Sequence, residues 1–153
     1  MLTLRRRSSH DDLTVAPSAG RPVLLATLDV PFSEEAMAFA VDSAVESGQP
    51  LLLVNAAEIL PTVYSMLGYG YVERDDLQVE LRKPAELAHS LAVKVERLRV
   101  CSPHPVDALL EVVAERDPAV LVFGPDRRHL SNRRFRKAER AVRERTSCLV
   151  WVP

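Results

Sequence analysis

Residues 23–37 read VLLATLDVPFSEEAM, and within this segment a strand signal passes directly into a helix signal. The opening run is apolar without alternation, which is typical of a strand covered on both faces of a parallel sheet. Ser33 has the side chain of a helix N-cap, and two glutamates follow it where the helix dipole favours negative charge. Apolar residues then recur at helical spacing until Gly48, a residue suited to a helix end. We therefore expect a strand, a tight turn and a helix between residues 23 and 48.

The same alternation of signals continues to the C-terminus. Strands are predicted at residues 23–28, 51–56, 94–100, 119–123 and 148–152. Helices are predicted at residues 33–48, 74–91 and 105–116 and in the later part of 127–145, with a loop at 61–71. Pro84 predicts either a start or a kink in the second helix, because proline lacks an N–H and crowds the preceding turn. This order predicts an α/β fold with three layers around a doubly wound, mostly parallel sheet.

Length and composition favour one cytoplasmic domain. The chain has 153 residues, of which 47% are hydrophobic and 27% charged, as in ordinary globular proteins. Residues 1–21 lack an apolar pattern and predict a disordered tail before a domain at 22–153. No apolar run indicates a membrane span or a signal peptide. Cys101 and Cys148 are too few for a disulfide framework, which favours a reducing compartment.

Four segments together resemble the universal stress protein family. They are residues 29–37, 51–54, 105–124 and 142–153, in an order and spacing that cover the chain from about 22 to 153. The resemblance implies five parallel strands in the order 3-2-1-4-5, a role in stress response, and ATP or another adenine nucleotide as ligand. It also implies that the last strand, residues 148–152, is a sheet edge. Because this strand is apolar and an exposed apolar edge needs covering, we expect a homodimer through it, the alternative being cover by loops or by the N-terminal tail. Cys101 and Cys148 would then lie at opposite sides of the sheet.

Members of this family that bind ATP have a glycine loop after the fourth strand, where bare backbone lets main-chain amides approach the phosphates. The pattern is Gly, two residues, Gly, about nine residues, and Gly followed by Ser or Thr. Here Gly124 keeps the first position, Arg127 stands at the second, and the third falls near Arg136. Lys137 or Ala138 replaces the hydroxyl residue. This degenerate loop argues against ATP in the family's usual geometry.

The other half of the family's site is better preserved. In doubly wound sheets, ligands bind beyond the carboxyl ends of the strands, where the winding reverses. By resemblance, Thr27 and Asp29 would line the adenosine end, and the backbone of Val54 would meet the adenine edge. Each residue also has a structural interpretation, since Asp29 suits a turn or a cap and Val54 suits the core.

The segment from Arg127 to Arg145 is strongly basic. It contains nine Arg or Lys residues and two Glu residues, a local charge of +7 in a chain of net charge −1. Three interpretations remain open: a solvated helix face, an anion site in which arginines replace glycine amides, and a nucleic-acid surface. The last is disfavoured because Phe135 is the only aromatic residue in the segment.

No catalytic signature is found, so we do not expect an enzyme. The sequence lacks GxxxxGK[ST] and GxSxG, and its four histidines show no metal-binding spacing. Asp126 is the only carboxylate expected near Asp29, and Arg127 beside it should neutralise it. Two functions remain: a nucleotide- or anion-responsive stress regulator, and a dimeric interaction module that has lost its ligand. No metal, membrane or nucleic-acid partner is expected.

Overall fold

The computed structural model describes residues 20–59 and 75–153, with side chains in the second range from residue 82 onward. The predicted loop at 61–71 and the predicted tail up to residue 19 lie outside the described residues. The strands are β1 (Val23–Thr27), β2 (Leu51–Glu58), β3 (Val95–Ser102), β4 (Val120–Phe123) and β5 (Leu149–Trp151). The helices are α2 (Glu34–Ser47), α4 (Asp75–Ser90), α5 (Pro105–Arg116), the short 3-10 helix η1 (Arg127–His129) and α6 (Asn132–Arg145). Each predicted strand and helix is therefore present.

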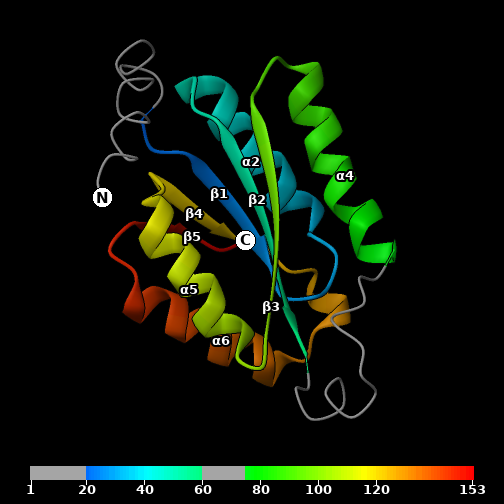
Figure 1. Ribbon diagram of the computed structural model, residues 1–153, viewed down its shortest axis with the longest axis vertical. Helices are drawn as coiled ribbons and strands as arrows, with labels where there is room; N and C mark the ends of the chain where they lie inside the picture. Colours follow the sequence, from blue (N-terminus) through cyan, green and yellow to red (C-terminus); the bar gives the residue numbers. More distant parts are fainter. Residues whose placement is uncertain (1–19, 60–74) are drawn as a thin grey trace, which may run out of the picture.

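The five strands form one parallel sheet in the order β3-β2-β1-β4-β5 (Figure 1). β1 is central, and its first residue, Val23, lies in register with Leu51 of β2 and Val120 of β4. The winding reverses between β1 and β4, because the chain builds β2 and β3 on one side of β1 and β4 and β5 on the other. The predicted doubly wound fold and its strand order are thus confirmed.

Helices cover both faces of the sheet (Figure 1). α5 and α6 pack on one face against a core that includes Leu24, Leu121 and Phe135. α2 and α4 pack on the other face against a second core that includes Leu25 and Val122. All five residues of β1 are buried, which explains why its sequence does not alternate between apolar and polar residues.

The ends of α2 follow the local signals in the sequence. The Ser33 side chain accepts a hydrogen bond from the N–H of Ala36 at 3.1 Å, as an N-cap does. At the other end, Gly48 adopts a left-handed conformation with φ of 69°, and its N–H donates to carbonyls of the last turn. Glycine has little steric cost at this angle, so the helix stops where the sequence predicts.

α4 departs from the sequence prediction at its proline. The helix runs from Asp75 to Ser90 with Pro84 inside it, so a helix start at Pro84 is wrong. An interior proline loses one helical hydrogen bond and costs roughly 3 kcal/mol. Ala88 is fully buried and Ala85 packs beside it in the core shared with α2. This packing stabilises the part of the helix that follows the proline and offsets part of its cost.

The two edges of the sheet are β3 and β5. Cys101 lies in β3 and Cys148 directly precedes β5, so the two thiols are at opposite sides of the sheet as predicted. None of the helices in the described part of the chain is both long and apolar enough to span a bilayer.

Candidate functional site

The loops after β1 and β4 meet where the winding reverses. The N–H of Ser33 donates to the carbonyl of Gly124 at 2.9 Å, and the N–H of Asp126 donates to the carbonyl of Pro31 at 2.8 Å. Phe32 and Pro125 add an isolated antiparallel bridge between the same loops. These contacts join the two loops and give their backbone N–H and C=O groups the hydrogen-bond partners that buried backbone needs.

A cleft of about 360 Å³ opens at the same carboxyl edge of the sheet. Leu28, directly after β1, and Glu58, at the end of β2, form one part of its wall. The first turn of α5 and one face of α6 form the rest. Known small-ligand pockets span about 300–1,000 Å³, so this cleft is large enough for a small ligand.

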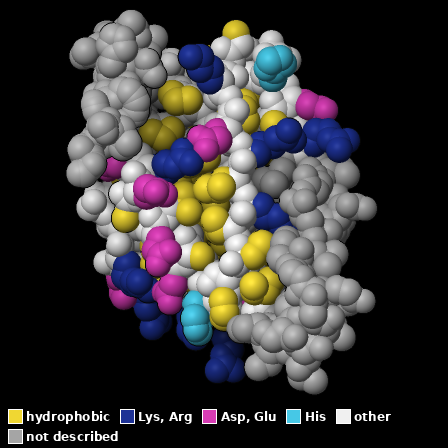
Figure 2. All heavy atoms as spheres, in the orientation of Figure 1, with side chains coloured by type: hydrophobic (Ala, Val, Ile, Leu, Met, Phe, Trp, Pro, Cys, Tyr) yellow, Lys and Arg dark blue, Asp and Glu magenta, His cyan; other side chains and the backbone are white. Residues whose placement is uncertain are grey.

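Three cationic residues lie on one face of α6 and line the cleft: Arg134, Lys137 and Arg145. Their separations of three and eight residues fit one side of a helix with 3.6 residues per turn. Arg136 is exposed on α6 but does not line the cleft. In Figure 2, Lys and Arg side chains are visible along the lower edge of the molecule, over α6. The helical phase therefore selects which of the many basic residues face the cleft.

The start of α5 adds a positive dipole end to the cleft. His104 is its N-cap residue but makes no capping hydrogen bond with its side chain, and Pro105 occupies the first turn. Both residues line the cleft. The first amides of a helix point outward along its axis and attract anions. The N-terminus of α5 and the cations of α6 thus both favour a negatively charged ligand.

Two of the three α6 cations already have carboxylate partners. Arg145 contacts Asp107 at 2.8 Å, and Arg134 lies 3.9 Å from Glu58. Lys137 forms no ion pair with any residue that the structure describes. The lining therefore carries three cations against two carboxylates, and Lys137 is the cation left to meet a ligand.

Thr27 and Asp29 shape the turn after β1. The buried Thr27 hydroxyl donates to the carbonyl of Val30 at 2.8 Å. Asp29 has a φ of 56°, and its N–H donates to the side-chain oxygen of Asn55 at 2.8 Å. Aspartate is one of the few L-residues that tolerate the left-handed region. The interpretation of Asp29 as a turn residue explains its left-handed backbone conformation. Its half-buried side chain lies at the carboxyl edge of the sheet, where the sequence predicts it.

Val54 and Gly124 both have packing roles. Val54 lies inside β2, fully buried, in register with Ala26 of β1 and Leu98 of β3. A Cβ added to Gly124 would lie 2.1 Å from the Cβ of Ala36, so α2 approaches this backbone too closely for any side chain. Close packing of a helix on the strand end thus explains this glycine without a phosphate.

Asp126 is paired, but with a different arginine from the one expected. The Arg128 guanidinium donates to both carboxylate oxygens of Asp126, at 3.1 and 2.8 Å, and the Arg128 N–H adds a third bond. The Arg128 guanidinium lowers the pKa of Asp126 to about 2, against the opposing effect of burial. The prediction that Arg127 neutralises Asp126 is wrong, because the η1 turn carries Arg127 away from the carboxylate.

Arg127 instead packs on α6. Its guanidinium lies 4.2 Å from the centre of the Phe135 ring and donates to the side-chain oxygen of Asn132 at 3.2 Å. Of the basic residues proposed from the sequence as ligands, the structure therefore brings only Lys137 into the cleft. Arg134, Arg145 and the start of α5 were missed, although the helical spacing of the α6 residues was a usable signal.

The architecture defines the class: a doubly wound α/β protein with its candidate ligand cleft at the carboxyl edge of the sheet. Residues 20–152 match the model of the universal stress protein family, and the chain belongs to that family. The resemblance inferred from the sequence is thereby confirmed, and the protein is a stress-response protein of this type. No curated protein sequence matches the chain.

Solved structures agree on the fold. A universal stress protein in complex with cAMP is 24% identical, with 88% of this chain and 97% of that chain covered and a TM-score of 0.60. A universal stress protein from Archaeoglobus fulgidus is 18% identical, with 92% and 98% covered and a TM-score of 0.63. One from the same organism in complex with dAMP is 19% identical, with 86% and 96% covered and a TM-score of 0.57. At these identities the likeness concerns the fold.

Proposed function

We propose that this protein is a cytoplasmic, non-catalytic regulator that binds an adenine nucleotide or a related phosphate-bearing anion in the cleft between α5 and α6. The observation that carries the proposal is the convergence of Arg134, Lys137 and Arg145 with the N-terminus of α5 at the carboxyl edge of the sheet. The cAMP and dAMP complexes of proteins with the same fold support the choice of an adenine nucleotide.

Several main-chain amides after β4 are already occupied, which supports binding through side chains. The N–H groups of Arg128 and His129 donate to Asp126, and the N–H of Arg134 donates to the capping side chain of Ser131. A phosphate seated on these amides would have to replace internal hydrogen bonds. Cationic side chains form charge-assisted bonds to phosphate without that loss.

Calorimetric titration with ATP, ADP, AMP and cAMP tests the proposal. Lys137→Ala should weaken nucleotide binding by about 10- to 100-fold, because a hydrogen bond to a charged group contributes about 1.5–3 kcal/mol. Arg136→Ala is the matched control, since it removes one neighbouring positive charge outside the cleft. Equal effects of the two substitutions, or no heat from any nucleotide at millimolar concentration, would refute the proposed site.

The proposal includes no chemical step on the nucleotide. Asp126, a carboxylate at the reversal of winding, is neutralised by Arg128 and accepts three hydrogen bonds. Such a carboxylate is a poor general base, because its proton affinity is low. Release of phosphate from ATP above the uncatalysed rate would contradict this part of the proposal.

A second candidate function, a homodimeric interaction module without a ligand, has its own observation. Leu149 of the edge strand β5 is 70% exposed. Exposed apolar edge strands invite pairing with another strand, and a second copy would cover this edge. Leu149→Lys should then shift the protein from dimer to monomer in light scattering. Leu91→Lys, at a site 47% exposed on the turn after α4, is the control.

Nucleotide content after purification, oligomeric state and titration heat together separate the two candidates. Nucleotide carried through purification without added ligand favours the first. A dimer disrupted by Leu149→Lys, together with an absence of bound nucleotide and of titration heat, favours the second.

A further inference from the structure

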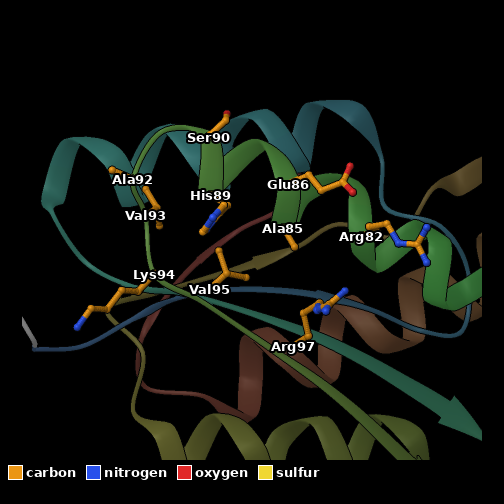
Figure 3. A pocket seen from close by; sticks show the side chains of 10 residues that line it. All are labelled: Arg82, Ala85, Glu86, His89, Ser90, Ala92, Val93, Lys94, Val95 and Arg97. Carbon is orange, nitrogen blue, oxygen red and sulfur yellow. The ribbon is translucent and has the colours of Figure 1, made fainter.

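A second hollow, of about 950 Å³, lies between the last turns of α4 and the start of β3. Its floor is apolar, formed by Ala85, Val93 and Val95. Figure 3 shows Lys94 at one end and Arg82 at the other, with His89 and Arg97 between them. We call this hollow the α4–β3 groove. It is a separate feature from the α5–α6 cleft and shares no residue with it.

Within the part of the chain that the structure describes, the cations of the α4–β3 groove lack acidic partners. Elsewhere on the surface arginines form ion pairs, as Arg116 does with Glu96 at 2.7 Å. Arg82, Lys94 and Arg97 form no ion pair with any residue within the described ranges, and Glu86 is the one carboxylate among the lining residues. Figure 2 shows Lys and Arg side chains gathered in this region, at the upper right over α4 and β3. Like charges that lie close together repel one another. An anionic partner would therefore reduce the electrostatic repulsion that these cations experience in the isolated chain.

Alternate backbone groups of β3 point to the outer edge of the sheet, away from β2. The N–H of Leu51 donates to the carbonyl of Lys94 at 2.8 Å, and the N–H of Ile59 donates to that of Ser102 at 3.1 Å. In a parallel ladder, alternate residues bond to the same neighbour. The even-numbered residues of β3 therefore bond to β2, and the N–H and C=O groups of Val95 and Arg97 point away from it.

We propose that the α4–β3 groove binds an extended acidic peptide segment of a partner protein, which pairs as an added strand with β3. Its backbone would bond to Val95 and Arg97, and its carboxylates would reach Arg82, Lys94 and Arg97. Adding a strand to an exposed sheet edge is an established mode of peptide binding, with main-chain bonds giving affinity and side chains giving specificity. This inference is independent of the nucleotide proposal.

The arrangement favours a peptide over other anions. The cations are spread along the groove and do not converge on one point (Figure 3), whereas a small phosphate ligand needs converging donors. The described lining residues include no Phe, Tyr or Trp, and single-stranded nucleic acids usually bind by stacking on such side chains.

Charged residues on an edge strand can also serve only to prevent pairing, and the experiment must separate this role from peptide binding. The probe is a fluorescein-labelled peptide that alternates Glu with Val, of about six residues because that is the usual strand length. Fluorescence anisotropy should show binding to the full chain that weakens as salt rises. The same peptide with Lys in place of Glu should not bind. No binding of the Glu peptide at millimolar protein would mean that the charges only protect the edge, and would overturn the proposal.

Paired variants locate the site. Arg82→Glu with Arg97→Glu should weaken peptide binding by about tenfold or more. Arg133→Glu with Arg140→Glu makes the same change of charge on the exposed side of α6 and should leave it unchanged. Arg82→Gln with Arg97→Gln is a milder pair that keeps the test valid if charge reversal disturbs folding. Equal losses in the groove and control variants would overturn the proposal.

Hydrogen exchange tests the strand pairing. Saturating peptide should slow exchange of the Val95 and Arg97 amides by about tenfold or more, because a new strand would bond to them. Unchanged exchange at both amides would overturn the added strand. An oligodeoxynucleotide of equal charge that competes more strongly than the peptide, and loses affinity in the groove variants alone, would assign the groove to nucleic acid instead.

Discussion

Gly124→Ala tests whether close packing against α2 determines the residue at the end of β4. The new Cβ would lie 2.1 Å from the Cβ of Ala36, well below the 3.0 Å that such contacts keep. Both carbons are attached directly to backbone, so no side-chain rotation relieves the contact and the start of α2 must move. That movement strains the bond from Ser33 to Gly124 at 2.9 Å and the Ser33 cap of Ala36 at 3.1 Å.

The expected loss of stability follows from these two terms. Overpacking costs about 1–3 kcal/mol and a weakened N-cap about 1 kcal/mol. We therefore expect the free energy of unfolding to fall by about 2–4 kcal/mol, or the Tm by about 10 °C. Urea unfolding followed by the fluorescence of Trp151, the only tryptophan of the chain, measures it. Trp151 stacks on Phe39 of α2 with ring centres 3.9 Å apart, so its signal reports on the same helix.

A second substitution identifies the cause. Ala36→Gly removes the opposing methyl group and should by itself cost about 1–2 kcal/mol, from helix propensity and lost burial. The double variant should lose at least about 1 kcal/mol less than the sum of the two single losses. Gly20→Ala is the control, because its nearest contact would be an ordinary 3.8 Å. A stability of Gly124→Ala within about 0.5 kcal/mol of the unchanged protein would refute the packing argument.

Two further predictions concern local electrostatics and backbone strain. The Arg128 guanidinium lowers the folded-state pKa of Asp126 to about 2 from an ordinary 3.8, so its contribution to stability is complete above about pH 5 and is lost as the pH falls toward 2. Asp126→Asn should therefore flatten the decline in the free energy of unfolding between those pH values, and parallel profiles in urea titrations would contradict it. Ala92, after α4, has a φ of 64°, where an L-residue costs about 1–2 kcal/mol. Ala92→Gly should raise the Tm by about 2 °C in calorimetry, since glycine's entropy offsets part of the gain, and a lowered Tm would count against strain at this residue.

The order of strands and helices was predictable because it depends on local signals. The apolar run at β1 needs cover on both faces wherever it lies, which leads to helices on both sides of the sheet. Ser33 and Gly48 mark the ends of α2 through bonds that reach no further than one helical turn. Pro84 was the exception, because tertiary packing of its neighbours outweighs the local cost of proline in a helix.

The candidate sites depend on which residues meet, and this was not predictable from sequence order. Arg145 and Asp107 are 38 residues apart along the chain, yet they meet beside Lys137 at the cleft. Arg128, and not Arg127, reaches Asp126, because the η1 turn sets the direction of each side chain.

Local chemistry along the chain therefore established the α/β class, the order of the elements and the family, since each depends on the spacing of nearby residues. Only the folded chain established that α2 packs directly against Gly124, that one face of α6 lines the cleft, and that cations with no ion-pair partner among the described residues gather beside β3. The physical reason is that helical phase, strand register and the approach of one backbone to another arise when distant segments pack, and a linear sequence does not contain those distances.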